Sequence, residues 1–333
     1  MSFKTTPKAP ARRITMAAAA GLFGLLASSG SAWAQAWPNK TVRVVVGFAP
    51  GGAADYVARA ISDPLSKVLG QSVVVENRAG AGSSLAADFV SKAPADGYTL
   101  LIASPSSVSV NPTLNPKLTY MKDLMPVTLV TTSPLVVAVN PKAGINTLQE
   151  LINTAKKSPG MLNYTSSGNG SAPHLGAAHF SSVAGVQMVH IPYKGGAPAI
   201  QAVVAGDAQL TFGTPPSVLP MVTAGRLKAL AVTSVVASPL VPGVPAAAES
   251  GLPGYSMSFW YGFFAPAGTP PEAVKRLFEA VREVMQRADV KAALAREGTE
   301  VALSKSPEDF AAFLAEDSRF WAKLVKDSGV KSD

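Results

Sequence analysis

Four segments rich in glycine and serine each precede a stretch with helical periodicity, and they are the residues best suited to chemistry. They occupy residues 47–55, 77–84, 166–174 and 193–199. A helix N-terminus exposes unpaired N–H groups and about half a positive charge, so it binds an anion without a basic side chain. Tight turns in an α/β protein also need glycine, so both interpretations stay open for any single loop. The recurrence of the pattern favours an anion-binding site.

Other motifs of chemical interest are weak or missing. The sequence has no cysteine, which excludes thiolate nucleophiles, redox pairs and thiolate zinc sites. His174, His179 and His190 lack the close spacing of metal ligands. Residues 80–85 form a GxGxxG motif with leucine in place of the third glycine, and neither a P-loop nor a GxSxG elbow is present. We therefore expect no cofactor and no metal. An α/β hydrolase or transferase assembled from distant residues is the enzymatic alternative.

Single side chains near the loops allow two interpretations each. Asp55 either compensates the dipole of a predicted helix or meets a ligand amine or water. His174 is either structural or ligand-binding, and Phe48 either ends a buried strand or forms a pocket wall. Lys194 is interpreted as a solvated charge, with the steering of an anion as the alternative. The aromatic residues near position 260 are interpreted as core: Phe259, Trp260, Tyr261, Phe263 and Phe264.

The elements that must position these loops alternate between strand and helix. The β-branched runs 41–48, 72–77 and 98–104 are predicted strands, with helices beginning near Ala53 and Ser83. Strand, crossover helix and strand in succession indicate a parallel, right-handed α/β sheet.

A second series of the same kind follows the extended segment 126–140. We predict helices at 147–157 and 173–184, and further strands, the last at 227–233. After an apolar strand from Trp260, the chain ends in three predicted helices: 271–287, 289–297 and 307–327, the last with Ser306 as its N-cap. Two series of this kind predict two α/β lobes with a cleft between them, joined by crossings near residues 135 and 255.

The first 34 residues have the pattern of a cleavable secretory signal peptide. Four basic residues precede the apolar run 14–27, and Ala32-Trp33-Ala34 matches an A-x-A cleavage site before Gln35. The apolar run is shorter than the roughly 20 residues that span a membrane. We therefore expect an exported, periplasmic protein.

The net charge points away from nucleic acid. The formal charge is +8, and removal of the four cations of residues 1–34 leaves +4. No basic cluster occurs in the remaining chain. A modest positive charge of this kind suits a small acidic ligand better than a polynucleotide.

Five ordered segments carry a resemblance to a known family. They are WPNKTVRVVVGFAPGGAADYVAR, QSVVVENRAGAGSSLAADFVSKAPADGYTLL, NYTSSGNGSAPHLGAAHF, HIPYKGGAPAIQAVVAGDAQLTF and GRLKALAVTS. Together they resemble the Bug-type receptors, the periplasmic substrate-binding proteins of tripartite tricarboxylate transporters. The resemblance covers nearly the whole chain after the signal peptide.

The resemblance implies an α/β type II periplasmic-binding-protein fold, with two α/β lobes on a two-stranded hinge and the ligand cleft between them. Lobe 1 would comprise 35–135 plus 256–333, and lobe 2 would comprise 136–255. The implied function is a monomeric receptor that closes over a small organic carboxylate and delivers it to the membrane permease subunits of a transporter. A signalling adaptor with the same binding chemistry is a further possibility.

Carried over position by position, the resemblance also implies a set of ligand-binding residues. They are Phe48, Pro50, Gly51, Gly52 and Asp55 in the first loop, Ser104 and Ser106 after the third strand, and Ser166, Ser167, Gly168, Ser171 and His174 in the second lobe. Gly52 is expected to need a positive φ.

The sequence departs from the family pattern at two informative positions. Gln209 and Gly213 stand where relatives often carry acids. An amino acid, whose ammonium group needs an acidic partner, is therefore a less favoured ligand than a dicarboxylate or an aromatic acid. Gly213 is also predicted to leave room for a bulkier ligand and belongs to the predicted binding residues.

The signal-peptide pattern predicts where the exported protein begins. We expect an N-terminus at Gln35, within one or two residues, because the small residues before it fit the signal peptidase. The intact mass of exported protein measures this directly. Soluble exported protein that retains residues 14–34 would contradict the prediction.

Overall fold

The computed structural model describes residues 1–6 and 37–330, and residues 37–330 form two α/β lobes. This confirms the fold class that the sequence predicts. The predicted signal peptide falls almost entirely outside the described residues and stays a prediction. Within the described residues, no helix is long and apolar enough to cross a membrane.

The first sheet combines strands from both halves of the chain. Its members are β1 (Val42–Val46), β2 (Val73–Asn77), β3 (Thr99–Ala103), β4 (Leu124–Pro134), β10 (Ser258–Pro266) and β11 (Glu300–Val301). In the described residues their order is β11-β4-β10-β3-β1-β2. β1 is parallel to β2 and β3, as the crossover pattern predicts, but β10 is antiparallel to β3 and β4. The sheet is mixed because β10 returns from the other lobe in the opposite direction.

Amphipathic helices cover this sheet. The helices are α2 (Ala53–Leu69), α3 (Ser84–Ser91), α4 (Asn111–Leu114), α9 (Pro271–Gln286), α10 (Ala288–Arg296) and α11 (Pro307–Ser328), with the short helical turns η1 (Ala81–Ser83), η2 (Ser106–Val110) and η3 (Tyr120–Asp123). α2 buries Val57, Ile61 and Leu65, which recur every four residues on one face. The predicted N-cap of α11 is confirmed, since the N–H of Asp309 donates to Ser306 Oγ at 3.2 Å.

The second lobe repeats the design. Its strands are β5 (Val136–Val139), β6 (Asn163–Ser166), β7 (Val189–Pro192), β8 (Leu210–Gly213) and β9 (Lys228–Val232), in the order β7-β6-β8-β5-β9 among the described residues. Its helices are α5 (Leu148–Lys157), α6 (Ala172–Ala184), α7 (Gly196–Ala205) and α8 (Pro215–Thr223), preceded by the turn η4 (Pro141–Ala143). Apolar β-branched residues fill β5, which is buried along its whole length.

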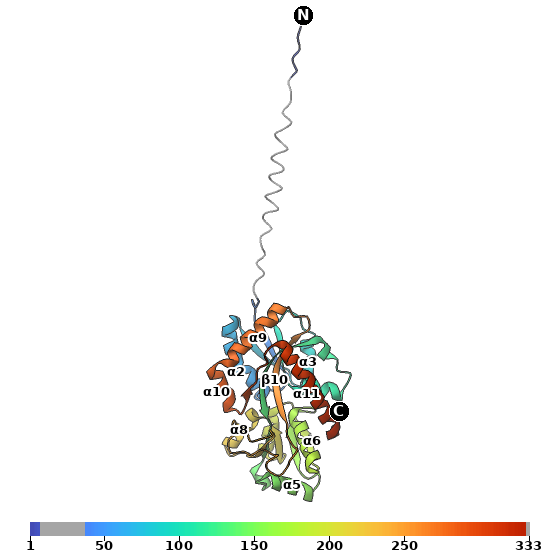
Figure 1. The fold of residues 1–333 in the computed structure, drawn as a ribbon, viewed down its shortest axis with the longest axis vertical. Coiled ribbons are helices and arrows are strands. Elements are labelled where there is room, and N and C mark those ends of the chain that lie inside the picture. Colours follow the sequence, from blue (N-terminus) through green and yellow to red (C-terminus); the bar gives the residue numbers. More distant parts are fainter. Residues whose placement is uncertain (7–36, 331–333) are drawn as a thin grey trace.

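The lobes lie at opposite ends of the molecule, with α2, α3 and α9 in one and α5, α6 and α8 in the other (Figure 1). β10 lies near the middle, and α11 reaches from the first lobe to contact α6 of the second. The limits proposed for the lobes as separate domains stay a prediction.

One buried threonine ties the two crossings together. The Leu135 N–H, between β4 and β5, donates to Thr233 Oγ1 at 2.8 Å, and that hydroxyl donates to the Met257 carbonyl, just before β10, at 2.8 Å. Thr233 is fully buried. Since the chain passes between the lobes at both places, this one hydroxyl joins the two strands of the hinge.

The hinge arrangement predicts a large difference between two substitutions of Thr233. Thr233→Val keeps the shape but leaves two buried backbone groups without this partner, so we expect a loss of about 2 kcal/mol or more in the free energy of unfolding. Thr233→Ser, which keeps the hydroxyl, is the matched control. Urea unfolding followed by circular dichroism measures both. Equal stability of the two variants would contradict the role of the hydroxyl.

Candidate functional site

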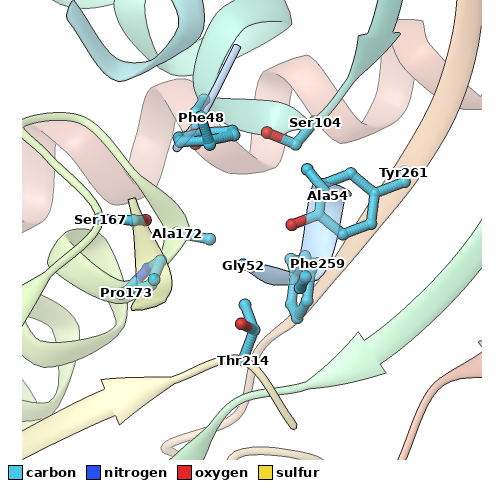
Figure 2. A pocket seen from close by; sticks show the side chains of 13 residues that line it. Phe48, Gly52, Ala54, Ser104, Ser167, Ala172, Pro173, Thr214, Phe259 and Tyr261 are labelled. Atoms are coloured by element: carbon cyan, nitrogen blue, oxygen red, sulfur yellow. The ribbon is translucent and has the colours of Figure 1, made fainter. Parts of the chain in front are cut away.

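A small cavity of about 20 Å³ lies between the lobes (Figure 2). It is lined from the first lobe by Phe48, Gly52, Ala53, Ala54, Ser104, Ser106, Phe259 and Tyr261, and from the second by Ser167, Ala172, Pro173, Gly196 and Thr214. None of these lining residues has a charged side chain.

The cavity lies where four α-helices begin. Gly52 and Ala53 open α2, Ala172 is the first residue of α6, Gly196 is the first of α7, and Thr214 is the N-cap of α8. The first N–H groups of a helix have no acceptor within it, and the four helix dipoles place their positive ends on the same space. Three of the four predicted glycine-rich loops, those before α2, α6 and α7, thus reach the cavity, whereas the loop 77–84 does not line it and the start of α8 was not predicted.

Two hydroxyl groups of the first lobe face the cavity. Ser104 is 3% exposed, and its Oγ has no hydrogen-bond partner among the described residues. In Figure 2 the hydroxyls of Ser104 and Tyr261 turn inward, into the space beside Phe48 and Ala54. Burial raises the pKa of Tyr261, so its hydroxyl stays protonated and able to donate. A ligand acceptor or donor would satisfy the buried Ser104 hydroxyl.

Glycines bring the main chains of the two lobes together around the cavity. The Ala49 N–H donates to the Lys194 carbonyl at 3.0 Å across the cleft. A Cβ on Gly52 would lie 3.4 Å from the Gly196 nitrogen, and one on Gly82 only 2.6 Å from the Asn169 carbonyl oxygen. The lobes therefore touch backbone to backbone, at a separation that larger residues would prevent at Gly82.

The first loop is held in place by Asp55 rather than by a ligand. Its carboxylate accepts hydrogen bonds from the Gly51 N–H at 3.0 Å, from Arg59 Nε at 2.9 Å and from Asn77 Nδ2 at 2.9 Å. Burial alone would raise the pKa of Asp55, but the bonds from Arg59, Gly51 and Asn77 outweigh it and lower the pKa. Asp55 does not line the cavity. These bonds give Asp55 a structural role in the first loop, and its contact with a ligand stays a prediction.

Five of the predicted binding residues line the cavity, namely Phe48, Gly52, Ser104, Ser106 and Ser167. Pro50 and Gly51 are exposed, and Ser171 caps α6, where it accepts from the His174 N–H at 3.4 Å. Ser166 and Gly168 in the loop before α6, and His174 in the first turn of α6, do not line the cavity. Ligand contact by any of these residues stays a prediction.

Two sequence-based expectations about glycines are wrong. The space left by Gly213 is filled by Val218 and Ile200, so its missing side chain does not widen the cavity. Gly52 has φ −88°, and the positive φ of the turn falls on Gly51 at 79°. The turn needs one left-handed residue, and the preceding glycine takes that position.

Sequence reasoning missed three groups of lining residues. Phe259 and Tyr261 are buried, as predicted for core, but they also form a wall of the cavity. Thr214 follows β8, and Gly196 opens α7 within the candidate anion-binding loop 193–199 but is absent from the predicted binding residues. The alternation of side chains between the two faces of β10 is the sequence signal for these residues. Phe259 and Tyr261 share one face, while Trp260 packs on the other face, against Phe310.

The comparison with known families agrees with this geometry. A match to the family described as "Tripartite tricarboxylate transporter family receptor" spans residues 57–330. The chain belongs to this receptor family. The resemblance inferred from the sequence motifs is thereby confirmed, and the family is one of periplasmic solute-binding proteins.

Relatives and solved structures cover almost the whole chain. BugT of Bordetella pertussis is 36% identical over 301 residues, which is 90% of this chain and 92% of the relative. The structure of R. palustris Rpa4515 with adipate has a TM-score of 0.85 and 34% identity, covering 89% of this chain and 99% of the other. MatC of Rhodopseudomonas palustris with bound malate has a TM-score of 0.82 and 33% identity, covering 87% and 100%.

The contact between the lobes predicts an engineered disulfide. A Cβ on Gly51 would lie 3.5 Å from the Ala197 Cβ, within the Cβ separation of about 3.5–4.5 Å that disulfides adopt. Because the chain has no native cysteine, Gly51→Cys with Ala197→Cys should form a bridge when oxidised and lock the lobes together. Intact mass, which falls by about 2 Da on bridge formation, and thiol titration measure it. Free thiols after oxidation would contradict the contact, with each single variant as control.

Proposed function

We propose that this chain is an extracytoplasmic solute-binding receptor. It captures a small organic carboxylate in the cavity between its lobes and delivers it to a tripartite tricarboxylate-type membrane transporter. Binding proceeds without chemical change to the ligand. The signal-peptide pattern supports a periplasmic location, and family membership supports the transporter as partner.

The convergence of four helix N-termini on one uncharged cavity carries the proposal. A carboxylate there would accept hydrogen bonds from main-chain N–H groups of α2 and α7, which belong to different lobes. The buried hydroxyl of Ser104 supplies a further group that needs a partner. Since both lobes contribute, the ligand stabilises the contact between them.

The lining also restricts the class of ligand. It contains no acidic side chain, so an ammonium group would lack a partner, and amino acids are disfavoured. Phe48, Phe259 and Tyr261 give it apolar surface that suits a hydrocarbon chain or a ring. A dicarboxylate or an aromatic acid fits both features, and the adipate and malate of the two relatives support this class.

Entry of such a ligand requires the lobes to separate. The cavity of about 20 Å³ has room for little more than one water molecule. The cavity is closed by contacts between loops of the two lobes. Each lobe has a separate sheet, so these contacts can break while both sheets stay intact. Opening at the two crossings exposes the helix N-termini without unfolding either lobe.

One contact in the second lobe is consistent with the enzymatic alternative. Ser166 Oγ lies 2.6 Å from His190 Nε2, the geometry of a nucleophile and its base. Ser166 is 1% exposed and does not line the cavity, and its hydroxyl also bonds to the main chain of Gly168. A substrate in the cavity therefore has no direct approach to it, which supports a receptor over a hydrolase.

We expect saturable binding of carboxylates and no turnover. Titration calorimetry of the chain from Gln35 against adipate, malate, benzoate and terephthalate tests the class, with the corresponding amides as matched uncharged controls. At 100 times its dissociation constant, a bound acid should stabilise the folded state by about 2.7 kcal/mol. Proton NMR of the recovered ligand should show it unchanged.

Two results would overturn the proposal. Equal affinity for an acid and its amide would mean that the helix N-termini do not hold an anion. A product peak that grows with time would establish an enzyme. The oxidised Gly51→Cys/Ala197→Cys protein provides a further control, because it should bind only after reduction reopens the lobes.

A further inference from the structure

Two histidines of the second lobe lie directly beneath the loop 166–171, which we call the second-lobe loop. The Gly170 N–H donates to His174 Nδ1 at 3.1 Å, and His190 Nε2 lies 2.6 Å from Ser166 Oγ. The two imidazole rings stack with their centroids 3.8 Å apart and their planes 9° apart. One ring therefore contacts the beginning of the loop and the other contacts its end.

Two residues next to these contacts line the cavity. Ser167 follows Ser166, and Ala172 follows the loop as the first residue of α6. A glycine-rich loop has many accessible main-chain conformations, so its shape must be fixed by contacts to something rigid. β7 and α6, which carry His190 and His174, are that rigid support.

The hydrogen bond at Gly170 fixes the state of His174. A main-chain N–H can only donate, so Nδ1 must carry a lone pair, and the ring is neutral with its proton on Nε2. Burial, assisted by the neighbouring His190, lowers the pKa of His174 to about 3. Among the described residues, Tyr164 of β6 and His190 of β7 are ionisable groups whose rings lie beside it, and Asp327 of α11 lines the same pocket.

We propose that the stacked pair His174–His190 is a positioning device for binding, which holds the second-lobe loop in its ligand-accepting shape only while His174 is neutral. Protonation of Nδ1 would place a hydrogen against the Gly170 N–H and release that end of the loop. The inference rests on the proposed function, since it concerns the loop of the same cavity. Neither histidine lines the cavity.

Nitrogen-15 NMR of the ligand-free protein tests the protonation state. We expect His174 to show the Nε2–H tautomer and to stay neutral from pH 8 to pH 5, while its Gly170 amide keeps its chemical shift. The neutral state is expected because the pKa of His174 is lowered. In the folded protein the ring resists protonation until the pH falls well below the ordinary histidine pKa of about 6.5. An Nδ1–H tautomer at pH 7 would overturn the proposal.

Three variants test the acceptor itself. Asn Oδ1 occupies nearly the place of His Nδ1, so His174→Asn should keep amide exchange at Gly170 within about threefold of wild type. His174→Gln, with its oxygen one bond further out, and His174→Leu, with none, should each speed exchange at least about tenfold. His179→Asn, on the same helix, is the matched control.

The outcomes separate the two proposals. If His174→Asn exchanges as fast as His174→Leu, or if His174→Gln is as protected as wild type, the acceptor does not hold the loop and the inference fails. Both experiments use ligand-free protein, so failure of every carboxylate to bind would overturn the proposed function alone. Melting temperatures of all variants show which of them remain folded.

Discussion

Close main-chain approach between the lobes is the constraint on which the site depends. The Ala49–Lys194 hydrogen bond and the contacts of Gly52 with Gly196 and of Gly82 with Asn169 bring loops from both lobes together. Only glycine allows the approach at Gly82, because a Cβ would lie 2.6 Å from a carbonyl oxygen. With the loops at this separation, helix N-termini of different lobes share one small space. A wider separation without a ligand in the space would leave the same N–H groups exposed to water.

The second physical feature is that the lining of the proposed anion site contains no cationic side chain. Lysine would bind a carboxylate through a point charge that salt screens and that depends little on direction. Main-chain N–H groups at helix starts have fixed directions and cost no side-chain entropy on binding. Aromatic walls exclude water, and this strengthens the attraction between the N–H dipoles and a carboxylate. Selectivity in such a site comes from shape and from the position of single hydroxyls, such as that of Ser104.

Buried polar side chains outside the cavity fix the parts that form it. Asp55 holds the turn at Gly51, His174 accepts from Gly170, and Thr233 joins the two crossings of the hinge. Each satisfies main-chain groups that a flexible loop would otherwise present to water. The movable elements are thus the lobes as units, while each loop stays ordered on its own lobe.

The sequence by itself determined the elements that depend on neighbours along the chain. Valine-rich runs specified β1 and β5, the Ser306 cap specified the start of α11, and the glycine loops marked the helix starts that could bind an anion. The ordered motifs also determined the family. Tertiary structure alone decided which of these groups meet. Gly213 faces Val218, Asp55 turns to its own loop, and Tyr261 reaches the cavity, because contacts between residues far apart in sequence depend on how the sheets and lobes pack, which no local pattern encodes.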